Sequence, residues 1–181
     1  MNAVDSSLDW YVVHLRSRQY AAIEINLRNL GYKVFAPTYR ANAVGRMRNS
    51  LRPLFPGYLF CALDPQHQLP VLMVSGVIGI LGAGKRLIPV APEEIGGIQR
   101  AVASNLYCEP VGSFVPGERV IVAAGPLKGV EGIVAQHKGV RSLILSVTLL
   151  NRSVAVELDA TAVERVGSLS ARRTVDSGRA A

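Results

Sequence analysis

The second part of the chain alternates short β-rich runs with turn signals, and this pattern restricts the fold more than any other feature. The runs occupy residues 118–123, 132–137, 142–149, 153–158 and 162–166. The dipeptides Gly125-Pro126, Lys138-Gly139 and Asn151-Arg152 punctuate them. Five short strands within about 50 residues predict a small SH3-like β-barrel.

The first part of the chain mixes strand and helix patterns. Residues 10–15 (WYVVHL) form a compact β-prone run. Apolar residues then recur on one helical face, and Gly31 follows as a stop signal. Pro92, Glu93 and Glu94 suit the first turn of a second helix. We therefore predict an α+β fold, in which an N-terminal α/β sandwich (an antiparallel sheet flanked by helices) precedes the barrel.

These patterns predict four segments. Residues 9–104 form the first domain, and residues 105–113 lack periodicity and serve as a linker. The barrel then spans residues 114–166. Residues 167–181 are rich in Ser, Ala, Gly and Arg, and we expect them to be disordered.

Positive charge is concentrated in the first part. The chain has a net charge of +7, and residues 1–113 hold 11 basic and 7 acidic residues, a net +4. No acidic residue occurs between Glu24 and Asp64. The stretch contains Arg40, Arg46, Arg48 and Arg52, which we interpret as an exposed basic hairpin or loop. A nucleic-acid-facing surface is thus expected in the first domain.

Several classes of protein do not fit the sequence. No apolar run approaches the roughly 20 residues that span a bilayer, and the N-terminus lacks the apolar core of a secretory signal. Cys61 and Cys108 are isolated in the sequence, which favours buried thiols in a reducing compartment over a disulfide. We expect a cytoplasmic monomer without membrane contacts.

The strongest enzymatic motif is a near match to a phosphate-binding loop. Residues 79–85 have the spacing GxxxxGK, but Arg86 stands where a magnesium-binding Ser or Thr is needed. The residues that follow are β-like and include Pro89, whereas such a loop should open a helix. We interpret the segment as a glycine-rich turn. No CxxC or HxxxH spacing occurs, so we expect no metal, no cofactor and no catalysis.

Two segments carry a family resemblance. Residues 10–13 (WYVV) and 53–60 (PLFPGYLF) resemble the N-terminal domain of the NusG family, and PLFPGYLF looks closest to the specialised UpxY and RfaH type of antiterminators. Residues 116–134 resemble a KOW motif, and residues 153–158 resemble the last strands of a KOW barrel. The resemblance covers residues 9–166.

The resemblance implies a transcription elongation or antitermination factor. Such a factor binds the clamp helices of the largest subunit of RNA polymerase and suppresses pausing or termination. The alternatives are a housekeeping NusG that couples polymerase to Rho or the ribosome, and a KOW-type protein that binds RNA or the ribosome.

The resemblance also implies site residues. Phe55, Tyr58 and Phe60 would line the polymerase-binding pocket, with Tyr11 and His14 nearby, although only one face of residues 58–60 can reach the surface. The nucleic-acid contacts would be made to non-template or upstream DNA by Arg16, Arg18, Gln19, Arg40, Arg46, Arg48 and Arg52. Leu127 and Lys128 would lie in a loop that meets a ribosomal protein or Rho, or Leu127 would be a buried turn residue.

Overall fold

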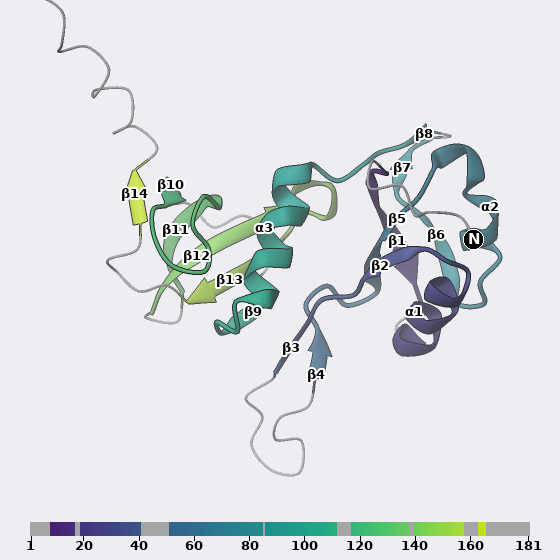
Figure 1. Ribbon diagram of the computed structural model, residues 1–181, viewed down its shortest axis with the longest axis horizontal. Helices are drawn as coiled ribbons and strands as arrows, with labels where there is room; N and C mark the ends of the chain where they lie inside the picture. The colour runs from purple at the N-terminus through teal and green to yellow at the C-terminus, as the bar shows by residue number, and fades with distance from the viewer. Residues whose placement is uncertain are drawn as a thin grey trace, which may run out of the picture.

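The computed structural model describes residues 8–16, 19–40, 51–84, 86–111, 117–137, 140–157 and 163–165. Two antiparallel sheets lie next to each other (Figure 1), and the helix α3 (Pro92–Ala103) lies against the second sheet. The observed class is the predicted α+β class, with helices on the first sheet and a strand-rich second half.

The first sheet has the strand order β2-β5-β1-β6. Its strands are β1 (Trp10–Leu15), β2 (Lys33–Phe35), β5 (Tyr58–Ala62) and β6 (Val77–Ile80). The helix α1 (Tyr20–Asn29) follows β1 and ends at the predicted glycine. Gly31 has a φ of +91°, and its N–H donates to the carbonyl of Arg28 at 2.9 Å. This left-handed conformation favours glycine, which explains why the helix stops there.

Smaller elements extend from this sheet. A hairpin of β3 (Thr38–Arg40) and β4 (Leu51–Pro53) carries Arg40 and Arg52. A 3-10 turn, η1 (Pro65–His67), and the short helix α2 (Leu69–Leu72) follow β5. The near match to a phosphate-binding loop forms a two-residue hairpin of β7 (Gly82–Ala83) and β8 (Arg86–Leu87). A strand therefore stands where a phosphate-binding loop needs a helix, and the predicted glycine-rich turn is confirmed.

The second sheet has the strand order β14-β10-β11-β12-β13-β9. Its strands, with the 3-10 turn η2 (Thr148–Leu150), are β9 (Cys108–Val111), β10 (Glu118–Val122), β11 (Glu131–His137), β12 (Val140–Val147), β13 (Arg152–Glu157) and β14 (Val163–Arg165). All five predicted strands are present. The sixth, β9, lies in the segment expected to be an aperiodic linker, so that expectation is wrong for these residues. They pair with β13 and satisfy its outer backbone groups.

The helix α3 packs against the barrel, although its sequence pattern placed it in the first domain. A side chain at Gly97 would meet Val130 and Leu145. The carboxylate of Glu94 accepts hydrogen bonds from the backbone N–H and the hydroxyl of Thr148. The two halves are thus in contact along α3, and the domain boundaries at residues 104 and 114 stay a prediction.

Two apolar clusters fill the molecule because side chains of β1 and β5 alternate between the faces of the first sheet. The helix-side core lies under α1 and includes Tyr11, Val13, Ile23 and Leu59. The shared core lies on the opposite face and continues through α3 into the barrel. It contains Val12, Leu54, Phe55, Phe60, Val90, Ile95, Ile98, Ala101, Cys108, Val120, Val122, Leu127, Val130, Leu143, Leu145, Val147, Val154 and Val156.

Candidate functional site

The turn at residues 55–58 sets the position of the predicted polymerase-contacting residues. Gly57 has a φ of +84°, and the N–H of Tyr58 donates to the carbonyl of Phe55 at 3.0 Å. The carbonyl of Gly57 accepts from the N–H of Leu15 at 2.8 Å, which fixes the turn beside the end of β1. The FPGY sequence therefore delivers Tyr58 to the sheet directly opposite His14.

Phe55 and Phe60 do not line an exposed pocket in this structure. Both are 0% exposed and lie in the shared core. Their rings meet edge to face with centroids 5.4 Å apart, and Phe60 also stacks on Phe35 at 5.9 Å. The burial follows from the shared core, which occupies this face of the sheet. A contact between these two side chains and another protein would require that core to open.

Tyr11 lies on the opposite face of the sheet from Phe60. It is 4% exposed and packs in the helix-side core. Its pKa is raised by burial, and the nearby carboxylates of Asp9 and Asp64 add to the effect. Strand alternation thus separates Tyr11 from the other predicted contact residues, and the grouping expected from the sequence is wrong for this residue.

Tyr58 and His14 form the part of the predicted site that is still accessible. Both are half-buried. Their rings stack with centroids 5.0 Å apart and planes 20° apart. The hydroxyl of Tyr20 donates to the carbonyl of Tyr58 at 2.9 Å, which ties α1 to this strand. The backbone at Tyr58 is therefore held by α1 as well as by the pairing with β1.

Arg152 of β13 lies over the ring of Tyr58. Its guanidinium carbon is 5.7 Å from the centroid of the Tyr58 ring, within the range of a cation–π contact. The residue comes from the barrel and follows Tyr58 by roughly 100 positions in the chain. No local sequence pattern connects residues that far apart. Sequence reasoning missed Arg152, and only the tertiary structure brings it to Tyr58.

A cavity of about 610 Å³, which we call the His14 cavity, opens beside the stack. It is lined by His14, Leu15, Arg16, Gln19, Pro56, Gly57 and Ile78. Predicted polymerase-contacting and nucleic-acid-contacting residues thus meet here. The N-terminus of α1 begins next to Gln19, and its first turn contains no acidic residue. The exposed cation Arg16 and the positive end of α1 make this region favourable for an anion.

The other predicted basic residues are elsewhere. Arg40 and Arg52 are exposed on the β3–β4 hairpin, where Arg52 faces Tyr39 in the strand register. Arg18, Arg46 and Arg48 lie outside the described residues. The structure consequently gives two separate basic regions, one at the His14 cavity and one on the hairpin.

The predicted partner loop of the barrel is closed. Leu127 is 1% exposed and belongs to the shared core, so the buried alternative is the one observed. The neighbouring Lys128 has an exposed side chain, and its carbonyl accepts a hydrogen bond from Arg100 of α3 at 3.3 Å. In this arrangement α3 lies against the loop that was expected to meet another protein.

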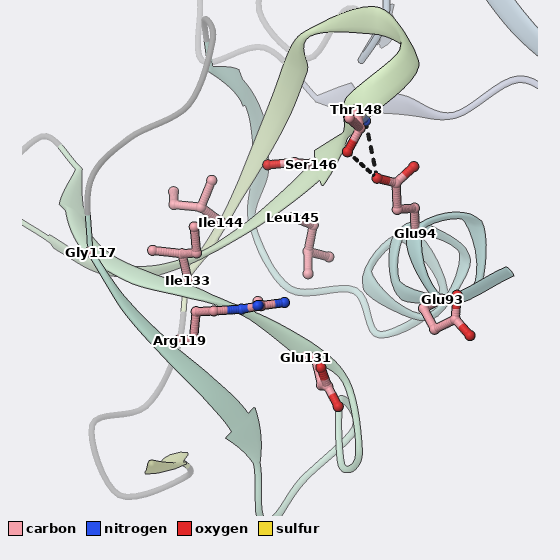
Figure 2. A pocket seen from close by; sticks show the side chains of 11 residues that line it. Glu93, Glu94, Gly117, Arg119, Glu131, Ile133, Ile144, Leu145, Ser146 and Thr148 are labelled. Carbon is pink, nitrogen blue, oxygen red and sulfur yellow. Dashed lines mark hydrogen bonds between the residues drawn. The ribbon is translucent and has the colours of Figure 1, made fainter. Parts of the chain in front are cut away.

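A further cavity of about 580 Å³, the glutamate cavity, lies between the start of α3 and the barrel strands. Figure 2 shows Glu93 and Glu94 on the helix and Glu131 on the facing strand, with Arg119 pointing between them. The inner wall is apolar and includes Ile133 and Leu145. Three carboxylates against one guanidinium make this cavity unsuitable for phosphates, so we exclude it from the nucleic-acid site.

Catalytic chemistry has little support among the described residues. They contain no cluster of three or more metal-ligating side chains. Cys61 and Cys108 are buried free thiols, and burial raises their pKa to about 12 and about 11. A reactive cysteine needs a lowered pKa, so neither thiol is suited to act as a nucleophile. Within the same part of the chain, no helix is long and apolar enough to cross a membrane.

Comparison with known proteins agrees with the family resemblance found in the sequence. Residues 8–99 match the family described as "Transcription termination factor nusG". The "Transcription termination/antitermination protein NusG" of Deinococcus radiodurans is 29% identical, and the match covers 88% of this chain and all of that protein. The protein of the same description from Escherichia coli K12 is 30% identical over 86% of this chain and 95% of its own length.

A solved structure is also similar. It is described as "Domain interaction in Thermotoga maritima NusG" and has a TM-score of 0.50 at 26% sequence identity. The match covers 87% of this chain and 97% of the other. The similarity therefore extends over both halves of the molecule.

Proposed function

Because this chain belongs to the NusG family of transcription termination and antitermination factors, we propose that it binds the clamp helices of the largest subunit of RNA polymerase. The proposed contact is made by the face of the first sheet that carries Tyr58 and His14. The family assignment also confirms that the chain is a transcription factor and not an enzyme. The proposed place of action is the cytoplasm.

The stacked pair of Tyr58 and His14 is the observation that carries this proposal. The pair is accessible beside the His14 cavity, and aromatic side chains in such positions often dominate the energy of a protein interface. Phe55 and Phe60 of the same segment lie in the shared core. If the barrel and α3 move away from this face, a continuous aromatic surface becomes available to the polymerase.

The mechanism we propose is a shift between conformations of the polymerase. A factor that binds the unpaused state more tightly than the paused state raises the population of the unpaused state. A difference of about 1.4 kcal/mol in binding free energy shifts that ratio tenfold. The factor needs no chemistry of its own for this effect.

Nucleic acid is the second proposed partner. Arg16 and Gln19 at the His14 cavity are placed to meet the phosphates of the non-template strand, with the positive end of α1 adding to the attraction. Arg40 and Arg52 on the hairpin would meet upstream DNA. Such contacts increase affinity without reading the sequence, and they weaken as salt rises.

The specialised role that we propose is antitermination on selected operons, as the UpxY and RfaH resemblance of PLFPGYLF implies. A housekeeping role is the alternative, and the similarity to NusG proteins over both halves of the chain favours it. In that role the barrel would couple polymerase to Rho or to a ribosomal protein. Leu127 and Lys128 would then be released from α3.

A pausing assay with purified RNA polymerase tests the function directly. We expect the protein to shorten pauses and to be retained on immobilised core polymerase. Tyr58→Ala should weaken this retention on the order of tenfold, because an aromatic anchor is lost. Tyr32→Ala is the matched control, since Tyr32 packs on the helix-side core and not on the shared core.

Two results would contradict the proposal at different levels. Unchanged pause lifetimes together with no retention would show that the chain is not an elongation factor. Normal retention of Tyr58→Ala would instead show that the site is wrong while the function stands. Readthrough of a Rho-dependent terminator, measured in the same system, separates antitermination from the housekeeping role.

A further inference from the structure

The glutamate cavity has no part in the function proposed above, although it has the size of a binding site. Its volume of about 580 Å³ lies within the range of roughly 300–1,000 Å³ that is typical of small-molecule pockets. One side is the first turn of α3, and the other side is formed by strands of the barrel. A ligand in this cavity would therefore touch both α3 and the barrel.

The inner wall of the cavity is apolar. It consists of Ile133 of β11 together with Ile144 and Leu145 of β12. Figure 2 shows these side chains on the strands that face the helix. Such a wall is favourable for hydrocarbon, because contact removes apolar surface from water. A ligand that uses the whole cavity therefore carries methylene groups, and a hydrated inorganic ion leaves this wall unused.

The charged residues around the apolar wall are unbalanced. Glu93, Glu94 and Glu131 bring three carboxylates. Arg119 brings one guanidinium, which leaves a net charge of −2. The ion pairs found among the described residues involve none of these side chains. Glu94 accepts hydrogen bonds from Thr148, whereas the exposed carboxylates of Glu93 and Glu131 are free to meet a ligand.

The two free carboxylates come from the two sides of the cavity. Glu93 is on α3, and Glu131 is on the facing strand β11 (Figure 2). Two negative charges with an apolar surface between them are complementary to a molecule that has a positive charge at each end and methylenes in the middle. An aliphatic diamine has this structure, and its two charges balance the net charge of the cavity.

The rest of the molecule makes this preference specific. The chain has a net charge of +7, so its overall field repels small cations. Non-specific binding of a diamine is therefore disfavoured over most of the surface. The glutamate cavity is a local exception, in which negative charge and apolar surface occur together.

We propose that the glutamate cavity binds an aliphatic diamine, with its methylenes on the apolar wall and its ammonium groups at Glu93 and Glu131. The ligand joins α3 to the barrel and stabilises the arrangement in which they are in contact. The site itself goes beyond the proposed function, but its effect on transcription rests on that function. Because the same arrangement buries Phe55 and Phe60, the diamine should lower the affinity for polymerase.

Calorimetric titration of the full chain with putrescine, in the absence of nucleic acid, tests the site. We expect one molecule to bind per chain and to raise the unfolding temperature. Butylamine has the same methylenes and a single ammonium group, and it should bind roughly two- to fivefold more weakly. Magnesium chloride supplies the same charge without methylenes and should raise the unfolding temperature less. An equal rise with magnesium would show that charge alone acts and would overturn the proposal.

Two variants remove the free carboxylates one at a time. Glu93→Gln and Glu131→Gln should each weaken putrescine binding roughly two- to fivefold, because each loses one exposed ion pair. Both side chains are exposed, so the fold should tolerate the changes, and thermal unfolding verifies this. Glu24→Gln on α1 is the matched control, since it removes the same charge outside the cavity. Unaltered binding in both cavity variants would contradict the proposed site.

Arg119→Ala tests the charge of the ligand. The guanidinium repels a cation, so its removal should strengthen putrescine binding roughly two- to fivefold. Weaker binding by this variant would argue against a diamine, because it would mean that Arg119 attracts the ligand. A molecule with a carboxylate would behave in that way.

Retention on immobilised core polymerase separates this proposal from the proposed function. Putrescine should reduce the retention of wild type more than that of the double variant Glu93→Gln and Glu131→Gln. An equal reduction would show that the diamine acts on the polymerase and not through the cavity. Failure of the protein to be retained without putrescine would instead contradict the proposed function, and the calorimetric result would still decide whether the site exists.

Discussion

At the scale of single residues, the same aromatic type serves in different ways within a short segment. Phe55 and Phe60 are in the shared core, whereas Tyr58 between them reaches the surface and stacks on His14. Alternation along β5 accounts for the difference between Tyr58 and its neighbour Leu59, but not for the burial of Phe60. That burial depends on what covers the face, which is a property of the tertiary structure.

The two thiols give a prediction at this scale. Burial raises the pKa of Cys61 to about 12 and that of Cys108 to about 11. In the unfolded chain both thiols ionise near their ordinary pKa of about 8.5, so above that pH the unfolded state binds fewer protons than the folded state. The free energy of unfolding should therefore fall as pH rises from about 9 to 11, by at most about 1.4 kcal/mol per pH unit for each thiol.

Urea denaturation at a series of pH values measures this effect. The double variant Cys61→Ala and Cys108→Ala should be less stable at pH 8 but should lose less stability between pH 9 and 11. Burial also raises the pKa of Tyr20, which adds a contribution of the same sign in both proteins. Identical pH profiles of the two proteins would contradict the prediction.

At the scale of secondary-structure elements, α3 and β9 are the informative ones. The helical pattern and the proline at its start locate α3 in the sequence, but they do not say which sheet it covers. Gly97 is the residue that permits its close approach to Val130 and Leu145. β9 is a strand because β13 offers it a partner, although its own sequence contains Pro110 and lacks periodicity.

A pair of adjacent glycines tests the packing of α3. Gly97→Leu should destabilise the protein by about 1–3 kcal/mol, because the new side chain is forced against the barrel. Gly96→Leu is the matched control, since a Cβ at that position meets nothing within 4 Å. The free energy of unfolding of Gly96→Leu should rise by up to about 1 kcal/mol, because leucine has a higher helix propensity than glycine. Urea denaturation measures both values, and equal stabilities would show that α3 does not rest on the barrel.

At the scale of the whole molecule, part of the surface expected to meet partners faces inwards. Phe55 and Phe60 of the first sheet and Leu127 of the barrel lie in the same shared core. Arg152 additionally covers the ring of Tyr58 from the barrel side. Polymerase binding through this face thus has to work against the contacts between the two halves, and its apparent affinity is reduced accordingly.

Removing the contact from the barrel should favour binding. We expect Arg152→Ala to raise the affinity for core polymerase roughly two- to fivefold, because an exposed cation–π contact contributes about 0.5–1 kcal/mol to the closed arrangement. Arg86→Ala removes an exposed arginine of β8 and is the control. Binding assays with the full chain measure both. An unchanged or lower affinity of Arg152→Ala would show that Arg152 does not hold the two halves together.

The sequence by itself determined the α+β class, the helix stop at Gly31, the barrel strands, the glycine-rich turn before Arg86 and the family. Each of these depends on local patterns: alternation, helical periodicity, turn residues and motif spacing. Only the tertiary structure decided that β9 joins the barrel, that α3 covers Leu127, and that Arg152 meets Tyr58. Those features depend on which apolar surfaces pack together and exclude water. Residues far apart in the chain carry no local sequence pattern that predicts this packing.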